Sequence, residues 1–271
     1  RGFHLVRGDV RDFDLVRKVV EGVDAVFHLA ALVDVALSGE NPVLFDEVNV
    51  VGTLNLLKAC VDSGVRRFVF ASSAAVYGDS EPPMKREDML PKPISPYGVS
   101  KLAAENYVRV FNELYGLETV CLRYFNVYGP RQGLASTYSG VITAFVSRLL
   151  KGQSPVIHGD GSQTRDFVNV DDVVSANMFA LESKSAVGEV FNIASGTVVS
   201  ISELARILQQ FTNTGHLKPV FTEPRPGDIK HCSGDISKAE ELLGFHPKVQ
   251  LKDGLSKLVK WQLNAIHAVK A

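Results

Sequence analysis

Apolar residues in the first two-thirds of the chain occur alternately in short runs and in helical stripes. The short runs predict buried strands, and stripes with apolar residues three and four positions apart predict helices that cover a sheet. Strands that are apolar throughout are typical of a parallel sheet buried on both faces, so we expect a doubly wound α/β fold with ligands at the carboxyl edge of its strands. The predicted strands are residues 3–8, 24–30, 66–72 and 119–125, and the predicted helices are residues 12–20, 43–62 and 97–115.

The pattern changes after about residue 130, where glycine and proline become denser and the expected elements become shorter. We divide the chain there into a larger domain, residues 1–130, and a smaller lobe, residues 131–271, which we expect to lie over the ligand edge of the sheet. Part of this second segment, residues 165–195, should return to the main sheet, because EVFNIAS reads as another strand. Residues 235–245 and 251–268 predict two further helices, of which the first ends at Gly244.

The beginning of the chain lacks a feature that dinucleotide-binding sheets usually have. Such a sheet opens with a strand, a glycine-rich turn and a helix whose N-terminus holds the pyrophosphate. The nearest sequence, Gly159-Asp160-Gly161, has no strand before it and no helix after it in the predicted pattern. We therefore expect that the sequence starts in what would be the third strand of such a sheet.

Charge and cysteine content exclude several classes of protein. The 29 basic and 30 acidic residues give a formal charge of −1, so no basic surface for nucleic acid is expected. Cys60, Cys121 and Cys232 are far apart and form no CxxC pair, which excludes a zinc ribbon or a disulfide framework. His158 and His231 lack partners at metal-ligand spacing, so we expect no metal. Because no apolar run reaches the roughly 18 residues of a membrane span, we expect a cytoplasmic protein with no membrane partner.

Tyr97 and Lys101 form the strongest chemical signal. They are four residues apart at the start of a predicted helix and therefore share one helix face. An ammonium beside a phenol favours the phenolate, and moving a tyrosine pKa from about 10 to near 7 requires roughly 4 kcal/mol. Ser72 and Ser73 end the strand before this helix, at the edge where a doubly wound sheet holds its chemistry. We therefore expect Ser73, Tyr97 and Lys101 to form a proton-transfer triad.

Several motifs together resemble a known family. VFHLAA, NVVGTLNLLKAC, FASSAAVYG, SPYGVSKLAAE, LRYFNVYGPRQ and QTRDFVNVDDVV occur in the order seen in the NAD-dependent epimerase/dehydratase family, the extended short-chain dehydrogenases. The resemblance covers essentially the whole chain. It implies a Rossmann-like NAD-binding domain in residues 1–130, a UDP-sugar-binding lobe mostly in residues 131–271, and about fifty residues missing from the front.

The resemblance also implies roles for individual residues. Tyr97 matches the catalytic base, Lys101 its partner and Ser73 the hydroxyl that assists it. Asp9 and Val10 match the pair that holds the adenine of NAD. The other residues implied to contact NAD are Ala30, Ala31, Asn49, Ser72, Tyr97, Lys101 and Tyr124, and those implied to contact the substrate are Ser73, Asn126, Arg165, Arg225, Asp228 and Cys232.

Within the implied substrate site, Arg165 and Arg225 match the arginines on the UDP phosphates, a task that suits the guanidinium fork. Asn126 matches a residue that reaches the diphosphate, and Asp228 matches the carboxylate on the uridine ribose. Cys232 matches the position beside the 2-substituent of the sugar. A small residue there leaves space for an N-acetyl group, so we expect both plain and N-acetylated hexoses to fit.

The residues after Ser73 indicate which reaction to expect. Family members that dehydrate or decarboxylate the sugar carry an extra acid there, whereas this chain has Ala74 and Ala75, which transfer no proton. We therefore expect a UDP-hexose 4-epimerase that oxidises carbon 4 with NAD, lets the ketose turn over and reduces it from the other face. UDP-glucuronate 4-epimerisation and a non-catalytic NAD-binding module remain alternatives, while a hydroxysteroid-type dehydrogenase has no need of Arg225 and Asp228.

The resemblance also implies a homodimer. We expect the helices at residues 43–62 and 97–115 to pair with their copies across a two-fold axis, which would bury apolar positions that the sheet does not cover.

Overall fold

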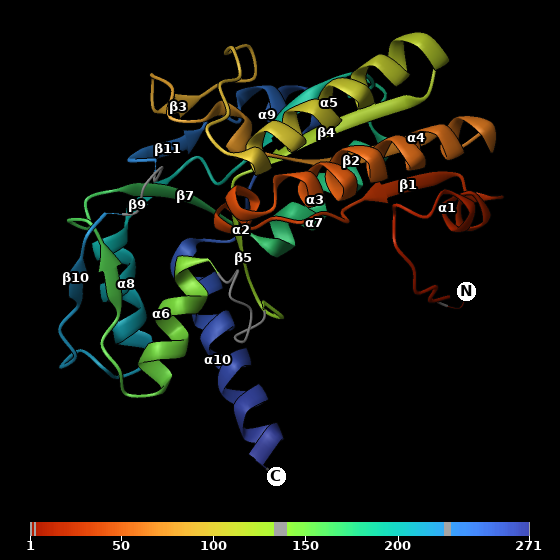
Figure 1. Ribbon diagram of the computed structural model, residues 1–271. Coiled ribbons are helices and arrows are strands. Elements are labelled where there is room, and N and C mark those ends of the chain that lie inside the picture. The colour runs from red at the N-terminus through yellow and green to blue at the C-terminus, as the bar shows by residue number, and fades with distance from the viewer. Residues whose placement is uncertain (1, 3, 133–139, 225–228, 271) are drawn as a thin grey trace.

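The computed structural model describes residues 2, 4–132, 140–224 and 229–270 (Figure 1). Its main sheet has four strands in the order β1-β2-β4-β8, and all neighbours in it are parallel. The α/β class and the parallel sheet predicted from the sequence are therefore confirmed. The strands of this sheet are β1 (Ala25–His28), β2 (Arg67–Ser73), β4 (Glu118–Tyr124) and β8 (Val190–Ile193).

Helices cover both faces of the main sheet, which explains why its strands are apolar throughout. On one face, α1 (Phe13–Val20), α4 (Gly52–Asp62) and α5 (Pro96–Tyr115) share a core with Phe68 and Phe70 of β2. On the other face, α7 (Val170–Glu182) and α9 (Ser237–Leu243) pack against Val69 of the same strand. Successive side chains of a strand point to opposite faces, so both sets of alternate positions in β2 are buried.

Capping residues set the ends of α5, the helix that carries Tyr97. Ser95 is its N-cap, and the Ser95 hydroxyl accepts a hydrogen bond of 3.1 Å from the N–H of Gly98. Pro96 stands in the first turn, where its missing N–H has no cost. The helix ends at Gly116, which has φ 68°, a left-handed conformation that glycine adopts without strain. These local signals place the first turn of α5 beside the carboxyl end of β2.

The predicted helix over residues 43–62 is interrupted. It consists of α3 (Pro42–Asp46), the π-helical turn η1 (Glu47–Val51) and α4, and the short helix α2 (Val35–Glu40) precedes it. The buried Asn49 lies in the π-helical turn. Its side chain accepts from the N–H of Leu32 at 2.8 Å and donates to the Leu32 carbonyl at 2.9 Å. Asn49 thereby fixes the segment that follows β1.

The second lobe lies beyond the carboxyl edge of the main sheet (Figure 1). Helices α6 (Val141–Leu150), α8 (Ile201–Phe211) and α10 (Leu251–Lys270) contribute to its apolar core, together with Ile157 and Phe167. Its strands form one sheet in the order β3-β11-β7-β5, with β9 antiparallel to β7, and a separate pair β10-β6. These strands are β3 (Met84–Lys85), β5 (Asn126–Tyr128), β6 (Val156–His158), β7 (Thr164–Asn169), β9 (Val198–Ser200), β10 (Val220–Thr222) and β11 (His231–Gly234).

Two of our expectations about the elements are wrong. Residues 4–8 form no strand, because no described strand lies beside them and a strand exists only where its backbone groups can pair. The outer edge of β1 has no partner strand in the described part of the chain, and Leu29 next to it is 58% exposed. The elements after residue 130 are also not all short, since α7 has 13 residues and α8 has 11.

Asp166 connects the two lobes. It lies fully buried in β7, and its Oδ1 accepts hydrogen bonds of 2.7 Å from both the N–H and the hydroxyl of Ser195. Its Oδ2 accepts from the N–H of Gly196 at 3.1 Å. Burial raises the pKa of Asp166, while these donors oppose the increase. Because Ser195 and Gly196 follow β8, the carboxylate joins the main sheet to the lobe that holds β7.

Asp166→Asn should weaken this connection with little change in volume. The amide NH₂ of asparagine would replace the carboxylate oxygen that now accepts from the N–H of Gly196, so two donors would face each other. An unpaired buried donor costs about 1–3 kcal/mol. We expect a decrease of that size in the free energy of unfolding measured with urea. Asp160→Asn, an exposed carboxylate in the same segment, is the control and should stay within about 0.5 kcal/mol. Equal stability of the two variants would contradict the connecting role of Asp166.

Candidate active site

Two cavities meet at the carboxyl ends of β2 and β4. The first has a volume of about 580 Å³ and includes Ala74, Ala75 and Ile94 in its lining. The second has a volume of about 480 Å³ and includes Ala31 and Lys101. The residues that line both cavities form their shared wall, namely Ser73, Tyr97, Tyr124, Phe125 and Asn126.

The three residues of the expected triad lie together at this wall. Tyr97 is buried in the first turn of α5, and its phenol interacts with the Ser73 hydroxyl at the end of β2. Lys101, one turn later on the same helix, is also buried and lines the second cavity. Gly98 allows this close approach, because a Cβ atom at that position would lie 2.8 Å from the carbonyl oxygen of Ala75.

The ammonium of Lys101 has a backbone partner and an aromatic neighbour on β2. Its ammonium donates a hydrogen bond of 2.7 Å to the carbonyl oxygen of Ala71 and lies 4.9 Å from the centre of the Phe70 ring. Burial lowers the pKa of Lys101 to about 8. Burial also raises the pKa of Tyr97, while the hydrogen bond with Ser73 opposes that increase. Burial therefore favours the neutral phenol.

Three more of the residues implied to contact NAD lie at the second cavity, although their polar groups have protein partners. Ser72 lines it, but its hydroxyl donates to the Glu105 carboxylate at 2.6 Å. The Tyr124 hydroxyl donates to Oδ1 of Asn177 at 2.9 Å, and burial raises the pKa of Tyr124 to about 12. Ala31 contributes a small apolar surface. The cavity thus combines apolar walls with the buried ammonium of Lys101.

Other implied NAD residues lie elsewhere. Asp9 and Val10 line a separate cavity of about 170 Å³, and neither lines the second cavity. The Asp9 carboxylate accepts from Arg11 at 2.8 Å, and this hydrogen bonding lowers the pKa of Asp9 to about 2. Ala30 is exposed and lines neither of the cavities that meet at Tyr97. Asn49 also lines neither of them, and its side chain hydrogen-bonds to the backbone of Leu32. The structure therefore does not place Asp9, Val10 or Ala30 at these two cavities. The amide of Asn49, in contrast, donates to the hydroxyl of Ser100, which lies between Tyr97 and Lys101 on α5, at 3.0 Å.

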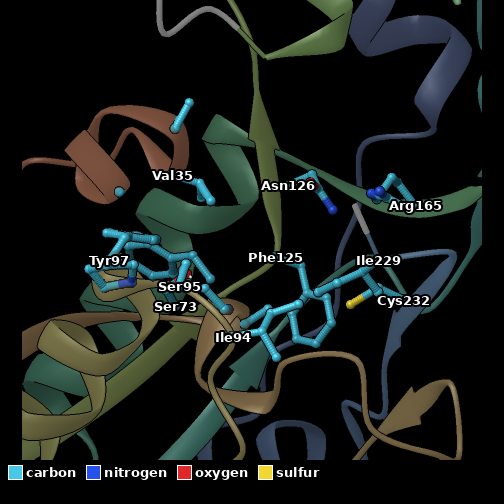
Figure 2. Close-up of a pocket in the computed structure, with 16 residues that line it drawn as sticks. Val35, Ser73, Ile94, Ser95, Tyr97, Phe125, Asn126, Arg165, Ile229 and Cys232 are labelled. Atoms are coloured by element: carbon cyan, nitrogen blue, oxygen red, sulfur yellow. Dashed lines mark hydrogen bonds between the residues drawn. The ribbon is translucent and has the colours of Figure 1, made fainter. Parts of the chain in front are cut away.

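The implied substrate residues that the structure describes all line the first cavity. Figure 2 shows Arg165, Cys232 and Asn126 on the side opposite Tyr97 and Ser73. The amide of Asn126 donates to the carbonyl oxygen of Asp166 at 2.9 Å, which ties this strand to β7. Arg165 and the buried Cys232 are partners in the β7-β11 register, so both belong to one wall.

Arg225 and Asp228 lie outside the described residues. Two segments that line the first cavity were missed by the sequence analysis. Val35, Ala36 and Gly39 come from α2, and Ile94 with Ser95 precede α5. Ser95 and Pro96 carried a helix-start signal, but nothing in the sequence pattern indicated that this turn also borders a cavity.

The histidines and cysteines of the described residues form no metal site. The described residues contain no cluster of histidine, cysteine and acidic side chains that could hold a metal ion. His28 is buried, hydrogen-bonds to the Thr53 hydroxyl at 2.9 Å, and has its pKa lowered to about 3 by burial, so it is a core histidine. All three cysteines are buried and free. Among the described helices, none has the length and apolar character that crossing a membrane requires.

The second cavity fits a flat, partly apolar cofactor that carries hydroxyl groups. Lys101 has three N–H donors, and the carbonyl of Ala71 uses one of them. The cavity also contains the side-chain oxygen of Gln132, a buried acceptor that has no partner among the described residues. Small residues such as Ala31 and Ala71 leave space beside these polar groups.

Comparison with known proteins identifies a family that the sequence matches. The profile described as the NAD dependent epimerase/dehydratase family matches residues 1–194. A protein named putative UDP-glucose 4-epimerase, from Methanocaldococcus jannaschii, is 42% identical over 261 residues, which cover 96% of this chain and 84% of that protein.

Solved structures agree with this match. A UDP-glucose 4-epimerase from Thermotoga maritima with UDP-glucose has a TM-score of 0.92 at 37% identity, covering 96% of this chain and 84% of that one. A UDP-N-acetylglucosamine 4-epimerase from Methanobrevibacter ruminantium, in complex with UDP-N-acetylmuramic acid, has a TM-score of 0.91 at 38% identity, covering 96% and 83%. Since the family profile spans more than half of the sequence and the fold agrees over nearly all of it, the chain belongs to the NAD-dependent epimerase/dehydratase family.

Proposed function

We propose that the protein interconverts a UDP-hexose and its 4-epimer, with UDP-glucose/UDP-galactose and the corresponding N-acetylated pair as substrates. The carrying observation is the shared wall, where Ser73 and Tyr97 border both cavities at once. A group at this wall can contact a sugar in the first cavity and a redox cofactor in the second. NAD, when bound, accepts two electrons from carbon 4 and returns them. Ala31, Lys101 and Tyr124 are the residues whose side chains would hold it.

The protein's own task is to move one proton at the sugar oxygen. In this proposal the Tyr97 phenolate takes the proton of the 4-hydroxyl as carbon 4 is oxidised, and the phenol returns it when the ketone is reduced. The Ser73 hydroxyl, which interacts with Tyr97, orients the same sugar oxygen. Burial of Tyr97 raises its pKa and opposes formation of the phenolate, so positive charge in the second cavity must supply more than the roughly 4 kcal/mol that separates an ordinary tyrosine from a pKa near 7. The buried ammonium of Lys101 is a fixed part of that charge.

The lining of the first cavity favours epimerisation over dehydration. Its described residues include no aspartate or glutamate, and Ala74 and Ala75 occupy the positions after Ser73. Removal of water from carbons 5 and 6 needs a further acid and base, for which this lining offers no carboxylate. UDP-glucuronate is the alternative substrate, and an assay with UDP-glucose, UDP-N-acetylglucosamine and UDP-glucuronate in parallel separates the candidates. A non-catalytic NAD-binding module would have no use for a buried phenol at the junction of two cavities.

The role of Tyr97 can be tested with Tyr97→Phe in the full-length protein. Loss of one positioned acid–base group should lower kcat by about 10²–10⁴, with little change in nucleotide affinity. Tyr115→Phe is the matched control, because Tyr115 lies on the same helix, is 56% exposed and lines neither cavity. Turnover of Tyr97→Phe at the level of this control would remove Tyr97 from the mechanism.

Cys232 is proposed to set the space beside the 2-substituent of the sugar. Its side chain is buried at the first cavity and belongs to a small core cluster with Tyr77 and Phe125. Cys232→Tyr should abolish turnover of UDP-N-acetylglucosamine by steric exclusion. Turnover of UDP-galactose should stay within about tenfold, a change of roughly 1.4 kcal/mol in the barrier. Cys232→Ala, which keeps the space, should retain both activities, and parallel loss of both sugars in the tyrosine variant would contradict the assignment.

We propose that the protein forms a homodimer through the outer face of α5. One stripe of this helix turns away from the sheet and exposes Val99 by 50%, Tyr107 by 41% and Leu114 by 69%. Val51 of η1, beside α5, is 47% exposed. Exposed apolar residues on neighbouring helices are typical of a helical subunit contact.

Charge on this stripe should separate the subunits. We expect Val99→Glu with Leu114→Glu to convert a dimer into a monomer at micromolar concentration, measured by light scattering of the full-length protein. Val198→Glu places the same charge on β9, where Val198 is 53% exposed, and should leave the dimer intact. A wild-type protein that is already monomeric would overturn this proposal.

A further inference from the structure

Three side chains on one face of α5 contact three consecutive residues at the end of β2. Tyr97 interacts with the hydroxyl of Ser73, and Lys101 donates to the carbonyl of Ala71. One turn further along the helix, Glu105 accepts from the hydroxyl of Ser72 at 2.6 Å. The first two contacts belong to the proposed active site, whereas Glu105 lines neither of its cavities.

Glu105 is itself held by an ion pair. Its Oε1 accepts from a terminal nitrogen of Arg123 at 2.5 Å, and its Oε2 accepts from Arg123 Nε at 3.1 Å. Arg123 lies in β4 and stacks its guanidinium 4.7 Å from the centre of the Tyr77 ring. Glu105 and Arg123 are 5% and 4% exposed, so this pair is shielded from water. A single carboxylate therefore joins α5, β2 and β4.

Stability of the fold is by itself a weak explanation for a buried ion pair such as Glu105 and Arg123. A buried ion pair loses so much hydration that apolar residues of similar volume often stabilise a fold equally well or better. What the carboxylate provides is direction, because its two oxygens are held by the planar guanidinium and one of them also receives the Ser72 hydroxyl. Ser73 is the next and last residue of the strand, so fixing Ser72 also limits the direction of the Ser73 side chain.

We propose that Glu105 is a positioning residue: through Ser72 it holds the end of β2 in the rotation that brings the Ser73 hydroxyl to Tyr97. The sugar-binding wall formed by Arg165 and Cys232 lies on other strands and does not depend on this contact. Loss of the positioning should therefore lower the rate of the chemical step and leave the binding of the nucleotide sugar unchanged. This inference rests on the proposed epimerase function.

The test begins with Ser72→Ala, which removes the bridging hydroxyl and leaves the ion pair in place. We expect kcat to fall about tenfold to a hundredfold, as for a reacting group displaced by a fraction of an ångström, with KM for the UDP-sugar within about twofold. Ser72→Thr retains a hydroxyl and should recover most of the rate. Glu113→Gln, an exposed member of the Arg109–Glu113 pair on the same helix, should match wild type.

A second variant separates positioning from stability. Glu105→Leu combined with Arg123→Met replaces the ion pair by apolar side chains, so the melting temperature should be kept while kcat falls as in Ser72→Ala. If the double variant and Ser72→Ala are both as active as wild type, the positioning role is overturned. It is also overturned if KM rises in proportion to the loss of kcat.

A readout without turnover keeps this test independent of the proposed function. In protein labelled with ¹³C at the ζ carbon of tyrosine, the Tyr97 signal is identified by its absence in Tyr97→Phe. We expect Ser72→Ala to shift that signal, and Glu113→Gln to leave it in place. An unshifted Tyr97 signal would overturn the positioning role, whereas a shifted signal in a protein that turns over no UDP-sugar would count against the epimerase proposal alone.

Discussion

The contact between the carboxyl end of β2 and the first three turns of α5 is the constraint on which the site depends. Phe68 and Phe70 anchor the strand in the core on the α5 side, and Lys101 lies over the Phe70 ring. These apolar contacts hold β2 and α5 so close together that one hydrogen bond can join a side chain of the helix to the strand. Gly98 is part of the same constraint, because a larger residue would meet the carbonyl of Ala75. Without this spacing Tyr97 and Ser73 would face solvent on separate elements.

The sequence predicts the parallel sheet well because its signals are local and repeated. Apolar runs identified β1, β2, β4 and β8 to within a few residues, and the capping residues Ser95 and Gly116 bound α5. The strand expected at residues 3–8 failed for a non-local reason, since its apolar pattern is insufficient when no strand lies beside it. The π-helical turn around Asn49 was also not foreseeable, because the periodicity continues across it.

The sequence predicted which residues lie at the site better than it predicted their hydrogen-bond partners. Tyr97 and Ser73 line both cavities, and Arg165 and Cys232 line the first. The hydrogen bonds were harder to predict, because they depend on tertiary distances. Lys101 shares a helix face with Tyr97, yet its long side chain extends to a backbone carbonyl of β2. Buried carboxylates such as Glu105 and Asp166 gave no signal at all, since their partners lie many residues away in sequence.

The shared wall of the two cavities has a thermodynamic consequence. Ser73, Tyr97, Tyr124, Phe125 and Asn126 border both, so a ligand that orders these side chains in one cavity also alters the wall of the other. The free energies of occupying the two cavities are then coupled, and such coupling is reciprocal. If a ligand in one cavity changes the affinity of the other cavity by some factor, a ligand in the other cavity changes the affinity of the first by the same factor. A substitution in this wall therefore alters the affinities of both cavities and the coupling between them. A change that adapts one cavity to a new ligand also changes the other cavity.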